Sequence, residues 1–101
     1  MLVADLDGAV VGFVSVSVKQ HWAGDRDAYI GELVVDATHE GQGVGRALVG
    51  AAVRWAQERG LSRITLETGA ANRRARQFYA TLGFEEEDIR LTRLLGLAVR
   101  E

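Results

Sequence analysis

The chain of 101 residues contains no cysteine and no proline, and only two histidines. Without cysteine there are no disulfides, no thiolate zinc sites and no nucleophilic thiol, and the cytoplasm is mildly favoured. His21 and His39 are too few for a typical zinc site, so no metal is expected. No apolar run approaches the about 20 residues that cross a bilayer, and acidic residues follow the N-terminus too soon for a signal peptide. We therefore expect a cytoplasmic protein with no membrane partner.

The residues that are present suit one globular domain. Hydrophobic residues make up 48% of the chain and charged residues 26%, both near the averages for globular proteins. A chain of this length builds one small core, so we expect a single domain over residues 1–101. The composition excludes a fibrous or disordered chain, and the length excludes a second catalytic domain.

The net charge of −2 hides an uneven distribution. Residues 1–40 carry two basic and seven acidic side chains, a net charge of −5, whereas residues 41–80 carry seven basic and two acidic side chains, a net charge of +5. Such asymmetry favours an anionic ligand at the middle of the chain and a cationic one at its acidic front. Solvated surface charge is the alternative.

The hydrophobic pattern predicts strands first and then alternating helices and strands. Residues 2–6 and 10–19 are typical of strands joined by a hairpin turn at Asp7 and Gly8, and residues 28–35 of a third strand after a polar loop. A helix over residues 44–59 should end at Gly60, and a second over residues 72–82 at Gly83. A short strand over residues 61–67 separates the helices, and residues 84–97 form a last extended segment. The order is that of an α/β domain.

Residues 40–46, Glu-Gly-Gln-Gly-Val-Gly-Arg, connect the third strand to the first helix. Glycines let the backbone approach a ligand, and the unpaired N–H groups at a helix start favour phosphate or pyrophosphate. Two nucleotide motifs fail, because a dinucleotide fingerprint needs glycine where Arg46 stands and a P-loop needs Lys followed by Ser or Thr where Arg46 and Ala47 stand. A plain flexible turn is the alternative.

This loop resembles the acetyl-CoA loop of the GNAT superfamily of N-acetyltransferases, which reads Gln or Arg, two residues, Gly, one residue, then Gly or Ala. Gly43 and Gly45 match, whereas Glu40 replaces Gln or Arg and Ala37 stands where many members carry proline. Residues 72–84 resemble a second family motif, Asn-x-x-Ala-x-x-Phe-Tyr-x-x-x-Gly-Phe. With two motifs in the right order and spacing, the chain is identified as a member of this superfamily.

The resemblance implies a GNAT fold of the α/β (α+β) class. Its sheet is mixed and mostly antiparallel, with two central parallel strands that splay apart and helices that flank them. Family members usually begin with a further strand and two helices, so the chain looks N-terminally shortened. An exposed edge on the first strand then predicts a homodimer.

The activity that the resemblance implies is direct acetyl transfer from acetyl-CoA to a primary amine of a small molecule or peptide, with no nucleic-acid partner. The pantetheine arm would bind the end of the third strand, and the pyrophosphate would bind the loop and helix start. An Asn matching Asn72 commonly contacts the cofactor, although Asn72 also suits a helix N-cap. The cofactor-binding candidates are thus Leu33, Val34, Val35, Gly41, Gln42, Gly43, Val44, Gly45, Arg46, Asn72 and Tyr79.

Acetyl transfer needs a base for the ammonium and an acid for the leaving thiolate. Tyr79 matches the tyrosine that commonly serves as the acid in this family, and a core aromatic is the alternative role. Glu67 is the first candidate base, because it ends a strand five residues before Asn72, the spacing of the ribosomal-protein N-terminal acetyltransferases of this family. Glu32, on the strand before the loop, is the second. Either carboxylate alternatively belongs to the solvated surface, and many family enzymes have no essential base.

The acidic front favours a positively charged acceptor, such as a polyamine, an aminoglycoside-like amine or a peptide amine. A non-catalytic CoA-binding or regulatory module is the alternative function, and Glu40 in the loop slightly favours it.

Overall fold

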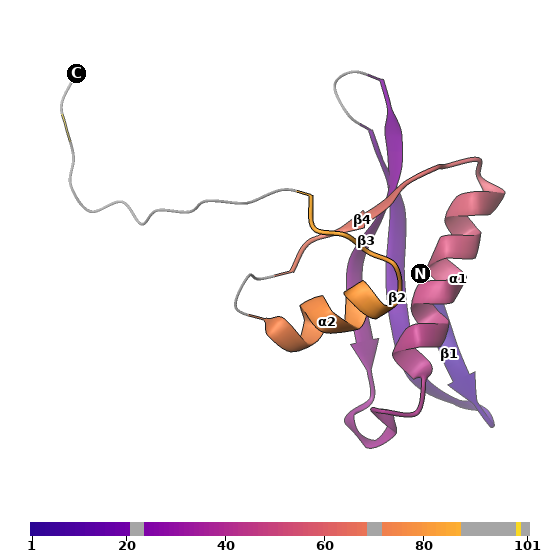
Figure 1. Cartoon of the computed structure of the whole chain (residues 1–101). Coiled ribbons are helices and arrows are strands. Elements are labelled where there is room, and N and C mark those ends of the chain that lie inside the picture. Colours follow the sequence, from indigo (N-terminus) through magenta and orange to yellow (C-terminus); the bar gives the residue numbers. More distant parts are fainter. Residues whose placement is uncertain (21–23, 69–71, 88–98, 100–101) are drawn as a thin grey trace.

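A computed structural model describes residues 1–20, 24–68, 72–87 and 99 of the chain. Within them lie β1 (Leu2–Leu6), β2 (Ala9–Gln20), β3 (Arg26–Val35), the short 3₁₀ helix η1 (Ala37–His39), α1 (Val44–Glu58), β4 (Ile64–Leu66) and α2 (Arg73–Thr81). The strands form one sheet in the order β1-β2-β3-β4, antiparallel except for the parallel pair β3 and β4 (Figure 1). The predicted α+β class and its mixed, mostly antiparallel sheet are confirmed.

The hairpin between β1 and β2 turns at the two predicted residues. Asp7 and Gly8 both have positive φ angles, 51° and 86°. Such a pair matches the right-handed twist of the strands it joins, which is why Asp-Gly favours short hairpins. The Gly8 N–H also donates a hydrogen bond of 2.8 Å to Asp5 Oδ1.

The core lies between one face of the sheet and α1. Val14 of β2 and Ile30 of β3 are buried against Leu48 and Ala52 of α1. The helix approaches closely at Gly12, where a Cβ atom would lie 3.1 Å from Leu48 Cδ1 and 2.7 Å from the Val34 carbonyl oxygen. In Figure 1, α1 lies on the right, where it overlaps β1 in this view, and α2 lies on the left. No residue of α2 is fully buried, so the core depends on α1.

Both helices end at the predicted glycines. Gly60 and Gly83 adopt left-handed φ angles of 71° and 91°. After α1, the Gly60 N–H bonds the Gln57 carbonyl and the Leu61 N–H bonds the Ala56 carbonyl, which is the Schellman pattern. The corresponding bonds after α2 run from the Gly83 N–H to the Ala80 carbonyl and from the Phe84 N–H to the Tyr79 carbonyl. In both places these bonds fix the direction in which the chain leaves the helix.

Several predicted boundaries are wrong. Residues 61–63 are not strand, because the turn at Gly60 still holds Leu61, and β4 keeps only three residues, Ile64–Leu66. β3 begins at Arg26 rather than Ala28, because Gln20 and Arg26 still pair across the hairpin. Residues 84–87 form no strand, and residues 88–97 of the predicted last segment lie outside the described residues. No helix in the described parts is long and apolar enough to cross a membrane.

Candidate functional site

The pairing of the two parallel strands, β3 and β4, ends after three residue pairs. β3 and β4 pair at Ala28 with Ile64, Tyr29 with Thr65 and Ile30 with Leu66, and β4 ends there. β3 continues through Val35 while still paired with β2. Among the described residues, the last five of β3 therefore have a neighbouring strand on one side only, at the place where the resemblance predicts that the two strands splay apart.

A β-bulge sits on β3 where the strands part. Ser15 of β2 pairs with Glu32 while Val16 pairs with Ile30, so Gly31 is the extra residue. The Glu32 N–H donates a hydrogen bond of 2.9 Å to the Ser15 hydroxyl. A side chain at Gly31 would place its Cβ atom 2.9 Å from the same Ser15 oxygen, so glycine and serine belong together here.

The bulge decides which backbone groups of β3 face the open edge. Glu32 donates its N–H toward β2, and Asp36 donates its N–H to the Val11 carbonyl of β2 at 2.8 Å. Successive residues of a strand direct their N–H and C=O groups to alternate sides. The groups of Leu33 and Val35 therefore point to the edge that β4 leaves open, whereas those of Val34 point to β2. Sequence reasoning grouped these three residues without distinguishing them.

The loop after β3 brings the start of α1 to the end of this open edge. Gly41 and Gly43 have φ angles of 78° and 84°, and nothing lies within 4 Å of a Cβ atom built on either. Gly43 is the N-cap of α1, and no side chain caps this helix end. The first N–H groups of α1, starting at Val44, are thus the unsatisfied donors that suit an anion.

The third loop glycine has a different role. A Cβ atom at Gly45 would lie 3.3 Å from Phe78 Cζ of α2 and 3.8 Å from Val35 Cγ2. Gly45 therefore lets Phe78 of α2 approach the first turn of α1, which itself lies against Val35 at the end of β3. This contact brings the second sequence motif to the first.

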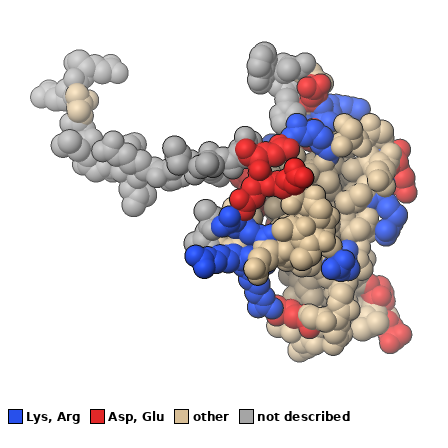
Figure 2. Space-filling view, in the orientation of Figure 1, with Lys and Arg blue, Asp and Glu red and all other residues tan. Residues whose placement is uncertain are grey.

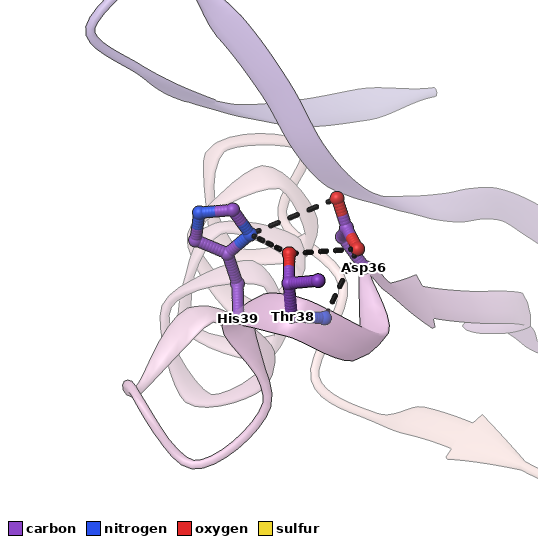
Figure 3. A network of polar contacts seen from close by, with 3 residues as sticks. All are labelled: Asp36, Thr38 and His39. Atoms are coloured by element: carbon purple, nitrogen blue, oxygen red, sulfur yellow. Dashed lines mark hydrogen bonds and ion pairs between the residues drawn. The ribbon is translucent and has the colours of Figure 1, made fainter.

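A small polar network fixes the turn between β3 and the loop (Figure 3). The Asp36 carboxylate accepts hydrogen bonds of 3.1 Å from the Thr38 N–H and the Thr38 hydroxyl. His39 Nδ1 lies 3.0 Å from the Thr38 hydroxyl and 3.7 Å from the carboxylate. The hydrogen bonds from Thr38, aided by His39, lower the pKa of Asp36. Sequence reasoning considered His39 only as a metal ligand and missed this network.

Asn72 is the N-cap of α2, as the alternative role predicted. Its Oδ1 accepts a hydrogen bond of 3.1 Å from the Ala75 N–H. The amide oxygen is thereby used, and the amide NH₂ is the group left for a ligand.

Tyr79 is half-buried between two aromatic rings. Its ring centroid lies 5.2 Å from that of Phe78 and 5.5 Å from that of Phe84, both edge to face. Phe84 follows Gly83 in the Schellman turn, and its N–H bonds the Tyr79 carbonyl. Burial raises the pKa of the Tyr79 phenol. Tyr79 is thus both packed and able to keep its proton at neutral pH.

The two candidate bases lie near the point where β3 and β4 part. Glu32 follows the bulge on β3, and Glu67 directly follows the last residue of β4. Both side chains are exposed. The structure therefore brings these carboxylates to one region of the sheet from strands that are distant in sequence.

Basic residues gather on α2 (Figure 2). Arg73 and Arg74 are exposed in its first turn, next to the end that Asn72 caps. Arg76 instead forms an ion pair with Glu86, which raises the pKa of the guanidinium further. A shallow depression lies between Arg73, Arg76, Gln77, Ala80 and Glu86.

Comparison with known proteins agrees with this geometry. The model of the acetyltransferase (GNAT) family matches residues 1–84. An uncharacterized N-acetyltransferase of Methanocaldococcus jannaschii is 35% identical over 91 residues, which cover 86% of this chain and 39% of that protein. N-acetyltransferase family 8 member 2 of Rattus norvegicus is 31% identical over 102 residues, which cover 96% of this chain and 45% of that protein.

Solved structures show the same fold. A putative acetyl transferase from Pyrococcus furiosus superposes with a TM-score of 0.80 at 26% identity, covering 87% of this chain and 59% of that one. An aminoglycoside acetyltransferase from an uncultured soil metagenomic sample gives 0.76 at 26% identity, covering 93% and 64%. The chain spans only 39% and 45% of the length of the two curated relatives named above. With a family model that covers most of its length and relatives above 30% identity, the chain belongs to the acetyltransferase (GNAT) family.

Proposed function

We propose that this chain, acting as a single domain over residues 1–101, transfers an acetyl group from acetyl-CoA to a primary amine of a small molecule or peptide. The observation that carries the proposal is the open edge of β3 beyond the pair Ile30 and Leu66, which ends at the uncapped start of α1. An extended arm with amide groups suits the edge, and a pyrophosphate suits the helix start.

The residues present fit acetyl-CoA as a substrate. Leu33 and Val35 offer backbone donors and acceptors to the amides of the pantetheine arm, while Val34 offers only its side chain, which is 44% exposed. The pyrophosphate is assigned to residues 41–46, because the backbone around Gly41 and Gly43 is open to close approach. Asn72 offers its amide NH₂, and the exposed Arg73 and Arg74 offer cations to the adenosine phosphate.

Residues of the chain are assigned to move the protons of the reaction. When bound, acetyl-CoA supplies an activated thioester. The amine must lose a proton before it attacks, and Glu67 or Glu32 is assigned to take that proton directly or through water. Tyr79 is assigned to interact with the leaving sulfur, either by protonating it or by donating a hydrogen bond to it.

The raised pKa of Tyr79 refines its assigned role. An ordinary phenol is about 1.5 pKa units less acidic than an alkyl thiol, so complete proton transfer to the thiolate is unfavourable by about 2 kcal/mol. Burial of Tyr79 widens this gap. We therefore expect Tyr79 to stabilise the developing thiolate mainly by donating a hydrogen bond.

The acceptor in this proposal is cationic. Residues 1–40 carry a net charge of −5, and Glu32 lies beside the parting of the strands. One of the similar solved structures is an aminoglycoside acetyltransferase, whose name implies an acceptor with several amines. A polyamine, an aminoglycoside-like amine or a peptide amine fits the same charge pattern.

The proposal includes a homodimer through β1. No described strand pairs with the outer edge of β1, and Val3, Leu6 and Val10 of the hairpin are exposed. A strand edge of this kind favours pairing with a second copy. Sedimentation velocity at working concentration should show a dimer, and a stable monomer would remove this part of the proposal.

Two measurements test the function. Isothermal titration should show acetyl-CoA binding, and an amine panel should release free thiol together with products that carry one added acetyl group. Gly43→Ala should weaken acetyl-CoA binding by about tenfold, because a methyl group obstructs close approach to the helix start. Gly60→Ala is the matched control, with a similar left-handed φ angle far from the loop, and should leave binding unchanged. Absence of acetyl-CoA binding by the wild-type chain would refute the proposal.

A further inference from the structure

The β-bulge on β3 fixes the direction of one peptide group, the one that joins Gly31 to Glu32. Its N–H, which belongs to Glu32, donates a hydrogen bond of 2.9 Å to the Ser15 hydroxyl on β2. The N–H and C=O groups of a planar trans peptide point in opposite directions. The Gly31 carbonyl therefore points away from β2, toward the edge of β3 on which β4 pairs.

This carbonyl lies at the first position beyond the pairing of the two parallel strands. Ile30 pairs with Leu66, the last residue of β4, and Gly31 is the next residue of β3. Among the described residues, no backbone hydrogen bond outside the helices and strands ends on this carbonyl. Gly31 is exposed and has no side chain, so a small polar group can approach its carbonyl oxygen.

The proposed position of acetyl-CoA brings the thioester toward the same place. The pyrophosphate is assigned to the loop and helix start that follow Val35, the last residue of β3. From there the arm runs back along the open edge past Leu33. Gly31 lies four residues before Val35, about 13 Å along a strand. The reactive end of the arm, opposite the pyrophosphate, therefore lies toward Gly31.

Two carboxylates lie near this carbonyl. Glu32 is the residue after Gly31, and Glu67 directly follows β4. Both side chains are exposed. Their charge attracts an ammonium and they can take its proton, whereas the carbonyl can only accept a hydrogen bond. The carboxylates and the carbonyl therefore suit different hydrogens of one amine.

We propose that the Gly31 carbonyl binds the acceptor amine through one N–H hydrogen bond, and that Ser15 is the positioning residue that directs this carbonyl. This inference rests on the proposed function. The amine nitrogen forms a bond to the acetyl carbon while the carbon–sulfur bond breaks. Of the three hydrogens of a primary ammonium, one leaves as a proton to Glu67, Glu32 or water, and one ends on the sulfur. The third stays in the product amide, and this is the hydrogen that the Gly31 carbonyl holds.

This role predicts selection of primary amines. A secondary ammonium has only two hydrogens, and the reaction removes both, since the product amide carries no N–H. The Gly31 carbonyl then loses its partner as the new bond forms. A site built around such a hydrogen bond strongly rejects an analogue that lacks the donor.

The test compares a primary amine with its N-methyl derivative, using the amine that the wild-type chain acetylates best. Thiol release gives kcat/KM for each amine, and isothermal titration gives the affinity for acetyl-CoA. We expect the wild type to prefer the primary amine by at least about 100-fold. The bulk of the methyl group contributes to this preference, so variants at Ser15 are needed to isolate the role of the carbonyl.

Ser15→Ala removes the hydroxyl that holds the peptide group. The register of β3 should survive, because Leu33 and Val35 still pack against the core. Affinity for acetyl-CoA should therefore stay within about twofold, whereas kcat/KM for the primary amine should fall about tenfold. For the N-methyl derivative kcat/KM should change little, because this amine has no hydrogen to keep on the carbonyl.

Three further variants complete the test. Ser15→Thr keeps a hydroxyl at the same position and should retain both the rate and the preference of the wild type. Ser17→Ala removes a hydroxyl from the same face of β2, opposite Tyr29 rather than Glu32, and should change neither. Should Ser15→Ala fail to fold, Ser15→Cys replaces it, since cysteine keeps the shape of serine but is a weaker acceptor.

Equal losses for the two amines in Ser15→Ala would overturn the inference, because a merely structural role does not distinguish them. An unchanged kcat/KM for the primary amine, or a wild type that acetylates both amines equally well, would overturn it too. In each of these cases acetyl transfer continues and the proposed function stands. If no amine is acetylated, the inference and the proposed function fail together.

Discussion

Replacing Gly31 with alanine should destabilise the fold, and the effect should reverse sign when Ser15 is also replaced. The new Cβ atom would lie 2.9 Å from the Ser15 hydroxyl oxygen, closer than side-chain carbons tolerate. The hydroxyl can rotate away only by giving up its hydrogen bond from the Glu32 N–H. The substitution therefore tests whether the bulge depends on this pair.

The magnitudes follow from the contacts. Loss of the hydrogen bond costs about 1 kcal/mol, so Ser15→Ala alone should lower the free energy of unfolding by about that amount. Gly31→Ala should also cost about 1 kcal/mol, as the lost bond and residual strain outweigh the about 0.5 kcal/mol that alanine gains by restricting the unfolded chain. In the Ser15→Ala background the obstacle is gone, so Gly31→Ala should stabilise by about 0.5 kcal/mol. The coupling between the two sites is then about 1.5 kcal/mol.

Urea unfolding of the wild type, both single variants and the double variant measures this coupling. A loss of 1 kcal/mol in a domain of this size lowers Tm by about 4–8 °C, so thermal scans provide a second reading. If the two effects add within about 0.3 kcal/mol, the reasoning is refuted. Both effects are argued to depend on the Ser15 hydroxyl oxygen, so they should not be independent.

Three further predictions concern the loop and α2. Tyr79→Phe should lower kcat about 100-fold and leave KM for acetyl-CoA unchanged; because burial raises the pKa of Tyr79, the wild-type kcat should show no loss from phenol ionisation below about pH 10. Asn72→Ala should cost about 1 kcal/mol of unfolding free energy and Asn72→Asp little, because an aspartate still accepts the Ala75 N–H; equal losses in urea unfolding would contradict the capping role. Asp36 has a lowered pKa in the folded chain, so its stabilising effect is present above about pH 4 and is lost as the pH falls through the folded pKa; acid unfolding curves should differ between wild type and Asp36→Asn above that range and converge below it.

Features set by local backbone chemistry were predictable from the sequence. Asp7 and Gly8 specify their hairpin by themselves, and Gly60 and Gly83 end their helices because a left-handed residue there costs glycine nothing. The conjunction of Gly83 and Phe84 has a physical reason as well. The glycine makes the turn, and the phenylalanine after it packs on Tyr79 one turn earlier.

Features set by pairing between strands were not predictable. The sequence of residues 61–67 is apolar and β-branched enough for a longer strand, but the turn at Gly60 takes Leu61, and only Ile64–Leu66 form strand. Nothing in the β3 sequence alone marks Gly31 as a bulge, because the signal lies in Ser15 on another strand. The distinction between Val34 and its neighbours Leu33 and Val35 depends on that bulge. The roles of Tyr79, Glu67 and Glu32 stay predictions.

The fold pairs part of the basic charge that the sequence places in residues 41–80. Two of the seven arginines of residues 41–80 are engaged by the acidic segment after α2, Arg63 with Glu87 and Arg76 with Glu86. Exposed ion pairs of this kind contribute little to stability, but they partly neutralise the basic middle of the chain. An anion at the loop would meet the N–H groups at the start of α1, whose positions the fold fixes, together with the exposed Arg46 in the same turn. This explains how Glu40 can stand in the loop, since a site made of backbone donors does not require a cationic side chain at that position.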